Sequence, residues 1–94
     1  MRRYSVRIPP EVGASLRHLH PEIKTKIRRA LEEMERDPFL GKPLKEPLKG
    51  LFSFRVSLYR IIYQIRAKEV LVEVIDIAKR SAVYQRVLAR EKPS

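Results

Sequence analysis

The sequence predicts a small α/β (α+β) domain, in which two N-terminal helices pack on an antiparallel-rich sheet in the order β-α-α-β-β-β-α. Three observations lead to this prediction. The 94 residues suffice for one domain, expected to span 1–94. Apolar residues between prolines in the N-terminal half recur at helical spacing, whereas residues 51–77 mostly alternate between apolar and polar side chains.

The N-terminal segment is expected to form a strand and a short helix. Residues 4–8 alternate, and Pro9 and Pro10 end the strand because proline cannot donate to a ladder. A helix can begin at Pro10 or Glu11, since proline is tolerated in a first turn. Its apolar face consists of Val12, Leu16 and Leu19.

A second helix is expected to begin at Pro21 and to end near Arg36 or Asp37, because the residue before Pro38 disfavours helical geometry. Its apolar stripe follows the spacing of an amphipathic helix. The stripe consists of Ile23, Ile27, Ala30, Leu31 and Met34. Residues 37–50 contain three prolines and two glycines without periodicity, which predicts a loop whose lysines face water.

Residues 51–66 predict a β-hairpin with a two-residue turn at Ser57 and Leu58. Opposite residues share a face of the sheet, so Arg55 faces Arg60 across the hairpin. One face is a predicted core, made of Phe52, Phe54, Val56, Tyr59, Ile61, Tyr63 and Ile65. The other face is not expected to be a core, and it carries Ser53, Arg55, Arg60, Ile62 and Gln64.

A last strand and a last helix complete the predicted fold. Ala67 and Lys68 are expected to form a turn. The core face should continue through Val70, Val72 and Val74, with Leu71, Glu73 and Ile75 on the opposite side. Ser81 or its neighbour can cap the helix, whose apolar side holds Val83, Val87 and Leu88.

The composition narrows the class of protein. The formal net charge is +10, and residues 41–68 contain seven Lys or Arg residues against the single acidic residue Glu46. Clustered positive charge favours a polyanionic partner, usually nucleic acid or an acidic protein, although basic proteins without such a partner exist. The chain has no cysteine and no apolar run of the roughly 18 residues that a membrane span requires. A cytoplasmic protein without a membrane role is therefore expected.

Several kinds of site are not supported. His18 and His20 are two residues apart and would point in different directions on a helix, so no metal site is expected. The sequence also lacks a phosphate-binding glycine loop, a dinucleotide fingerprint and a Gly-x-Ser-x-Gly turn. No cofactor is therefore predicted.

The remaining candidate site combines arginines from separate segments. If the last strand pairs with residues 59–66, Arg60 should lie near Ile75 and Ile77, with Arg80 a few residues further. Arg55, Arg60 and Arg80 would then converge at one edge of the sheet. Three guanidinium groups and the Tyr84 ring suit a phosphodiester and its base. The alternatives are that Arg55 and Arg60 are solvated surface residues and that Tyr84 packs on the sheet.

The segments LKGLFSFRVSLYRIIYQI and VLVEVIDIAKRSAVY, with the upstream Gly-Lys-Pro-Leu, resemble the RelE branch of the RelE/ParE toxin superfamily. The resemblance covers nearly the whole chain and implies a type II toxin whose partner is a RelB-like antitoxin with an acidic helical segment. It also implies metal-independent cleavage of mRNA in the ribosomal A site. The ribose 2′-hydroxyl would attack the adjacent phosphate, leaving a 2′,3′-cyclic phosphate and a 5′-hydroxyl.

By the same resemblance, Arg55, Arg60, Arg80 and Tyr84 are the catalytic residues. The basic side chains expected to bind RNA are Lys45, Lys49, Lys79 and Arg86. Ser53 departs from the family, because many relatives have a second basic residue there. Arginine remains charged and is a poor general base, so Lys45 or Lys49 is the expected substitute, unless the enzyme is slow, inactive or assisted by ribosomal RNA.

Two other functions remain open on the sequence alone. A ParE-like gyrase inhibitor would share the scaffold and act by binding a topoisomerase. A non-catalytic basic module would bind RNA or protein without cleaving either.

Overall fold

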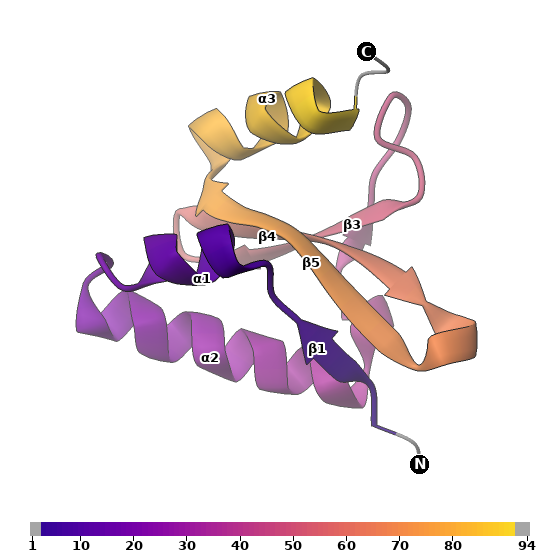
Figure 1. The fold of residues 1–94 in the computed structure, drawn as a ribbon, viewed down its shortest axis with the longest axis horizontal. Coiled ribbons are helices and arrows are strands. Elements are labelled where there is room, and N and C mark those ends of the chain that lie inside the picture. Colours follow the sequence, from indigo (N-terminus) through magenta and orange to yellow (C-terminus); the bar gives the residue numbers. More distant parts are fainter. Residues whose placement is uncertain (1–2, 92–94) are drawn as a thin grey trace.

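The computed structural model describes residues 3–91, which form a five-stranded mixed sheet with helices on both faces (Figure 1). The strands are β1 (Ser5–Arg7), β2 (Lys42–Pro43), β3 (Leu51–Val56), β4 (Tyr59–Arg66) and β5 (Leu71–Lys79). The α-helices are α1 (Pro10–Leu16), α2 (Pro21–Arg36) and α3 (Arg80–Glu91). Two short 3-10 helices, η1 (Pro38–Leu40) and η2 (Ala67–Glu69), lie in the connections. The predicted α+β class is confirmed.

The strands lie in the order β1-β5-β4-β3-β2, with β1 parallel to β5 and every other pair antiparallel. The predicted hairpin register is confirmed, since Arg55 pairs with Arg60 and Val56 pairs with Tyr59. Ser57 has a φ of 57°, a positive value at the first turn position that matches the twist of a two-residue hairpin.

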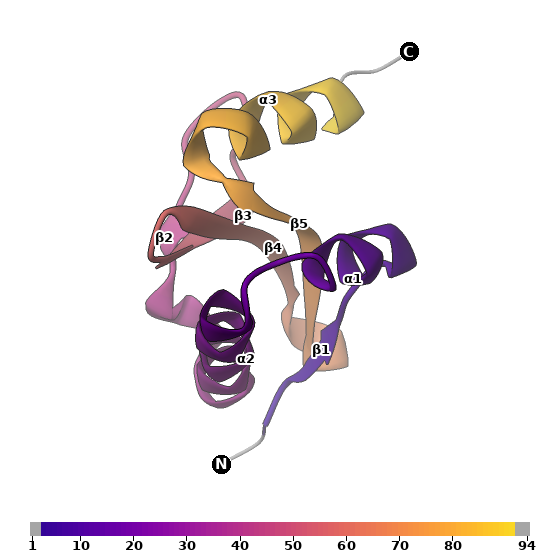
Figure 2. The same ribbon diagram turned by 90° about the vertical axis from the view of Figure 1, so that its left-hand side faces the viewer.

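Helices α1 and α2 cover one face of the sheet (Figure 2). Their apolar stripes meet the predicted aromatic and aliphatic face of the hairpin and of β5, which confirms the proposed packing. The fully buried members of this core include Val12 of α1, Ile27 and Met34 of α2, and Ile61 and Tyr63 of β4. Burial of such side chains contributes about 1.5–3 kcal/mol each.

The opposite face holds a second core, contrary to the expectation that this side of the hairpin would not be buried. Helix α3 follows β5 without a linker and lies over this face (Figure 2). Ile62 is fully buried there against Val83 and Val87, and Ser53 is also buried. The alternating pattern of β3 and β4 did not reveal this core, because the neighbours of Ile62 on this face are polar. Ser53 lies across from Ile62, and Gln64 lies two residues further along β4.

Residues 37–50 are more ordered than the predicted loop. Tyr63 donates a hydrogen bond from its hydroxyl to the Pro38 carbonyl at 2.7 Å and accepts one from the Gly41 amide at 3.1 Å. The short strand β2 follows at once, and it pairs Lys42 with Ser53 of β3. Leu48 then folds back into the second core. A single buried tyrosine therefore fixes this segment against the sheet.

The register of β5 differs from the prediction in two respects. Val70 was expected on the core face, but it lies in the turn before β5 with a φ of 52° and is only partly buried. A register shift at Ile62 and Tyr63 leaves Ile75 without a partner, so Arg60 pairs with Ala78, next to Ile77 as expected but away from Ile75. The shift moves the strand partner of Arg60 closer in sequence to Arg80.

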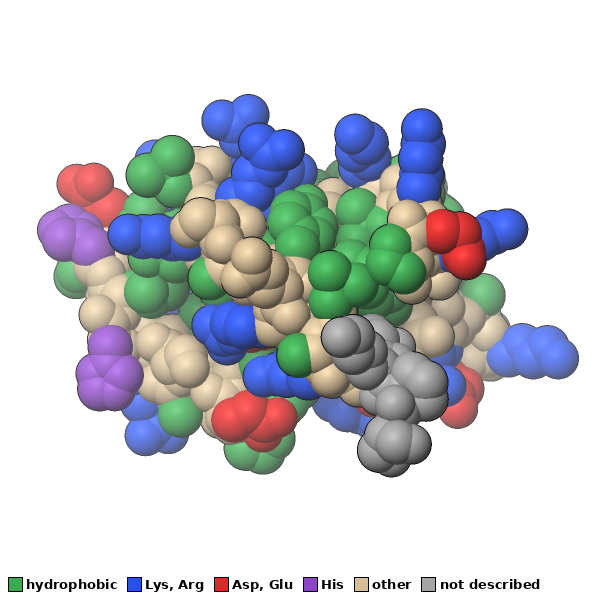
Figure 3. Space-filling view, turned by 90° about the horizontal axis from the view of Figure 1, so that it is seen from above, with side chains coloured by type: hydrophobic (Ala, Val, Ile, Leu, Met, Phe, Trp, Pro, Cys, Tyr) green, Lys and Arg blue, Asp and Glu red, His purple; other side chains and the backbone are tan. Residues whose placement is uncertain are grey.

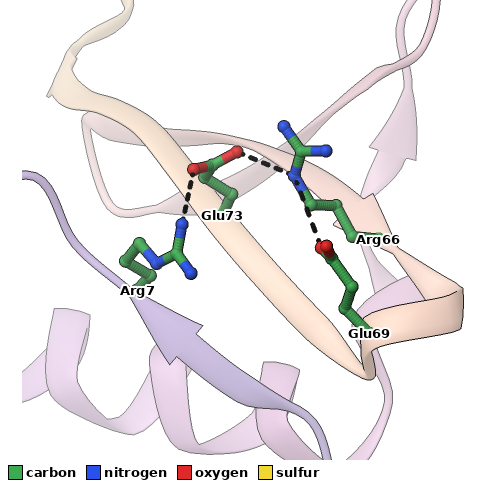
Figure 4. A network of polar contacts seen from close by, with 4 residues as sticks. All are labelled: Arg7, Arg66, Glu69 and Glu73. Carbon is green, nitrogen blue, oxygen red and sulfur yellow. Dashed lines mark hydrogen bonds and ion pairs between the residues drawn. The ribbon is translucent and has the colours of Figure 1, made fainter.

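An ion-pair network lies where β1 meets β5 (Figure 4). Glu73 accepts from Arg7 at 3.2 Å and from Arg66 at 3.0 Å, and Arg66 lies 3.9 Å from Glu69. These side chains are mostly exposed, so each pair contributes at most about 1 kcal/mol. No helix within residues 3–91 is long and apolar enough to cross a bilayer.

Candidate functional site

Three arginines from separate segments meet beside the hairpin turn. Arg55 of β3, Arg60 of β4 and Arg80 of α3 line one hollow of about 190 Å³, together with Ser57 and Leu58. The Arg80 amide donates to the Leu58 carbonyl at 3.2 Å, which fixes the first residue of α3 against the turn. The structure thus brings together the three guanidinium-bearing residues whose convergence the sequence predicted.

No ion pair within residues 3–91 offsets the positive charge that these three arginines bring to one hollow. Among the described residues, Arg7, Arg66 and Arg86 form ion pairs, whereas Arg55, Arg60 and Arg80 form none within residues 3–91. Like charges directly opposite one another across a hairpin are destabilising. An anion in the hollow would reverse that repulsion and accept charge-assisted hydrogen bonds from the guanidinium groups.

Tyr84 extends the site along α3. Its hydroxyl lies 3.0 Å from the Ser53 Oγ, and either oxygen can donate. The ring lines a second, larger hollow of about 560 Å³ with Leu58, Lys79, Arg80 and Ser81. Tyr84 therefore packs against the sheet and also borders open space. Because this hollow shares Leu58 and Arg80 with the arginine hollow, a phosphate in one and a base beside Tyr84 can belong to one nucleotide.

Ser53 has a structural role that the sequence did not indicate. Only 2% of its surface is exposed, and its hydroxyl holds the Tyr84 hydroxyl. A larger basic side chain at this position would occupy the space of that hydrogen bond. Ser53 therefore helps to hold Tyr84 in its position.

Lys42 is the basic residue that the sequence analysis missed. It lines a third hollow, of about 270 Å³, together with Ser53, Arg55 and Arg60. The segment around it has no periodicity, so only its pairing with β3 places it on the face of the arginines. The Gly-Lys-Pro-Leu motif was the available signal, but it does not by itself show pairing with β3.

The four residues expected to bind RNA fall in different surroundings. Lys45 lines a hollow of about 340 Å³ beside Tyr84, and Lys79 lines the Tyr84 hollow. Lys49 is exposed and lines none of these hollows. The Arg86 guanidinium donates to the buried Asp76 carboxylate at 2.9 Å, so it anchors α3 to β5.

Figure 3 shows the molecule from the side of α3, where Lys and Arg side chains are spread over the surface and Asp and Glu side chains are few. Residues 3–91 contain no group of three or more His, Asp or Glu side chains placed to hold a metal ion. The side chains that line the arginine and Tyr84 hollows supply fixed positive charges, hydrogen-bond donors and one aromatic ring.

Comparison with known proteins identifies the family. Residues 6–84 match the family described as "ParE toxin of type II toxin-antitoxin system, parDE". The chain belongs to this toxin family. The toxin is 32% identical over 85 residues to "Toxin RelG" of Mycobacterium tuberculosis, an alignment that covers 88% of this chain and 98% of the relative.

Solved structures support the RelE branch of the superfamily. The toxin component of the M. tuberculosis toxin-antitoxin complex RelBE2 superposes with a TM-score of 0.74 at 31% identity, covering 83% of this chain and 99% of that one. A mutant of E. coli toxin RelE in the free state superposes with a TM-score of 0.75 at 21% identity, covering 96% and 99%. At 21% identity, the similarity to E. coli RelE shows the fold alone. This toxin is thus a RelE-type member of the RelE/ParE superfamily, as its sequence motifs suggested.

Proposed function

We propose that this toxin is a ribosome-dependent endoribonuclease that cleaves mRNA in the A site and so stops translation. The observation that carries the proposal is the hollow where Arg55, Arg60 and Arg80 meet without a carboxylate partner in residues 3–91. A scissile phosphate would supply the missing negative charge. The adjoining hollow beside Tyr84 is of a size and apolar character that suits a nucleobase.

In the proposed reaction, the ribose 2′-oxygen forms a bond to phosphorus while the bond from phosphorus to the 5′-oxygen breaks. The 2′-hydroxyl proton passes to solvent, and a solvent proton reaches the departing 5′-oxygen. The products are a 2′,3′-cyclic phosphate and a 5′-hydroxyl. Arg60 and Arg80 stabilise the extra negative charge of the pentacovalent phosphorus, a contribution that grows in the transition state. The Tyr84 ring holds the adjacent base.

The proposed protein partner is an acidic, RelB-like antitoxin, since the relatives include toxins solved in complex with antitoxins. The net charge of +10 favours such a partner, and it equally favours ribosomal RNA in the cytoplasm. An antitoxin that covers the arginine hollow would block cleavage.

Primer extension on programmed ribosomes tests the proposal. Wild-type toxin is expected to give new 5′ ends within the A-site codon, and Arg60→Ala and Arg80→Ala are each expected to lower the cleavage rate about 100-fold or more. Both variants should also relieve growth arrest while remaining folded. The matched control is Arg66→Ala, which removes an arginine from the other end of β4, where it pairs with Glu73.

Three outcomes contradict the proposal. Full toxicity of both Arg60→Ala and Arg80→Ala would show that the site is wrongly assigned. A DNA-damage response with intact mRNA would indicate a gyrase inhibitor. Tight binding to ribosomes without cleavage products would indicate a non-catalytic RNA-binding module.

A further inference from the structure

The structure points to Lys42 as an additional catalytic residue, whose ammonium group contacts the scissile phosphate. This inference rests on the proposed ribonuclease function. This sequence resembles the RelE branch, and many members of that branch carry a basic residue at the strand position that Ser53 occupies here. Ser53 provides no positive charge at that position. The structure assigns this charge to the neighbouring strand β2, where Lys42 lies directly across from Ser53.

The geometry places Lys42 on the catalytic face. Opposite residues of an antiparallel pair project from the same face of a sheet, so Lys42 and Ser53 share the face of Arg55 and Arg60. All four residues line the same hollow of about 270 Å³. Since Arg55 and Arg60 also line the arginine hollow, the lysine borders the place where a phosphate would bind.

The backbone that carries Lys42 is held in place. The preceding residue, Gly41, donates its amide hydrogen bond to the Tyr63 hydroxyl, which itself donates to Pro38. Gly41 is buried so closely that a side chain there would overlap the Tyr63 hydroxyl. This contact fixes the start of β2, so only the lysine side chain has to be ordered when substrate binds.

The charge of Lys42 is available for an anion. No carboxylate within residues 3–91 forms an ion pair with it. An ammonium group at this position can donate to a non-bridging phosphate oxygen, and that bond strengthens as charge develops in the transition state. No proton transfer by Lys42 is required.

The other candidate lysines fit this role less well. Lys45, three residues further on, lines the hollow beside Tyr84 but neither of the hollows that contain Arg55 and Arg60. Lys49 lines none of them. A lysine at position 53 itself would disrupt the buried hydrogen bond between Ser53 and Tyr84. Lys42 therefore supplies the fourth cation while Ser53 keeps Tyr84 in position.

The absence of cysteine in the chain permits a chemical test. Lys42→Cys is expected to lower the single-turnover cleavage rate on programmed ribosomes about 100-fold, while ribosome affinity stays within about threefold of wild type. Alkylation of that single thiol with 2-bromoethylamine rebuilds an ammonium group of nearly the same length. The treated variant should recover most of the lost rate.

Lys68→Cys is the matched control, because it removes one exposed positive charge from η2, beyond the end of β4 that lies away from Arg60. It should cleave at the wild-type rate before and after alkylation. Equal cleavage by Lys42→Cys and Lys68→Cys would overturn the role of Lys42, as would a slow Lys42→Cys that alkylation fails to restore. Failure of the wild type to cleave would instead overturn the ribonuclease proposal and this inference with it.

Discussion

Helix α3, which carries Arg80 and Tyr84, is anchored to β5 by one partly buried ion pair. The Asp76 side chain is 0% exposed, and its Oδ1 accepts from the Ile77 amide and from Arg86, each at 2.9 Å. Its Oδ2 has no hydrogen-bond partner in the part of the chain that the structure describes. We expect Arg86→Met to lower the free energy of unfolding by about 2 kcal/mol, because a buried carboxylate loses its countercharge.

The magnitude follows from how far water can reach the pair. Removing one partner of a fully buried ion pair typically costs about 3–5 kcal/mol. The Arg86 side chain is 45% exposed, so water already screens the pair and could solvate the carboxylate after the substitution. The expected loss of stability is therefore closer to that of one charge-assisted hydrogen bond, about 1.5–3 kcal/mol. For a domain of this size, that loss corresponds to a fall in Tm of roughly 8–16 °C.

Urea unfolding at pH 7, followed by far-UV circular dichroism, measures the effect. The control is Arg90→Met, which removes an arginine from the next turn of the same helix and a hydrogen bond to the Ile75 carbonyl at 3.0 Å. The double variant Asp76→Asn with Arg86→Met should be more stable than Arg86→Met alone, since the buried charge is gone. Equal stability of wild type, Arg86→Met and Arg90→Met would refute the anchoring role and return Arg86 to the residues available for RNA.

Three further predictions concern the contacts that shape the site. Burial raises the pKa of Tyr63 to about 12 from its ordinary value of 10.0, so its contribution to stability is present below pH 10 and is lost as pH rises towards 12. The unfolding free energy of wild type relative to Tyr63→Phe should therefore fall between pH 10 and pH 12 in urea titrations, by at most about 1.4 kcal/mol per pH unit. Gly41→Ala should cost about 1–3 kcal/mol in the same assay because its Cβ would overlap the Tyr63 hydroxyl, whereas Gly13→Ala has open space and should stabilise α1. Ser53→Ala and Tyr84→Phe should each cost about 1 kcal/mol and slow cleavage to a similar degree, and additive effects in the double variant would show that their hydrogen bond does not position the ring.

The pairing of the β3–β4 hairpin could be predicted residue by residue because residues close together in the sequence determine it. Alternation fixes which side chains share a face, and a two-residue turn at Ser57 and Leu58 fixes the register between β3 and β4. That register placed Arg55 opposite Arg60. Arg80 could be added because it lies only a few residues beyond Ile77, and in the structure it directly follows the end of β5. The central part of the candidate site therefore followed from short-range pattern alone.

The remaining features depend on contacts that local pattern does not encode. The second core forms only because α3 turns back over the sheet, which buries Ile62 and Ser53. The partner of Arg60 shifted to Ala78 because the strand pairing changes register beside Tyr63. Strand β2 is two residues long, too short to show alternation, and it is held by a tyrosine more than twenty residues away. Each of these three features involves a residue whose neighbours are distant in sequence, whereas Val70 was misplaced by a local turn with a positive φ.

These long-range contacts also explain how a serine can stand in a basic site. Residue 53 faces α3, where a small hydroxyl side chain fits beneath Tyr84, and the position opposite it on β2 is exposed and carries Lys42. A charged side chain is costly when buried and inexpensive at an exposed edge strand, so the edge is the better place for the fourth cation. The same pair of strands can therefore hold the aromatic ring in place and carry the charge that we propose binds phosphate. On this reasoning, exchanging the two side chains by Lys42→Ser with Ser53→Lys should not restore a working site, because the lysine would displace Tyr84. Full cleavage by that double variant on programmed ribosomes would show that only the number of cations matters and not their strand.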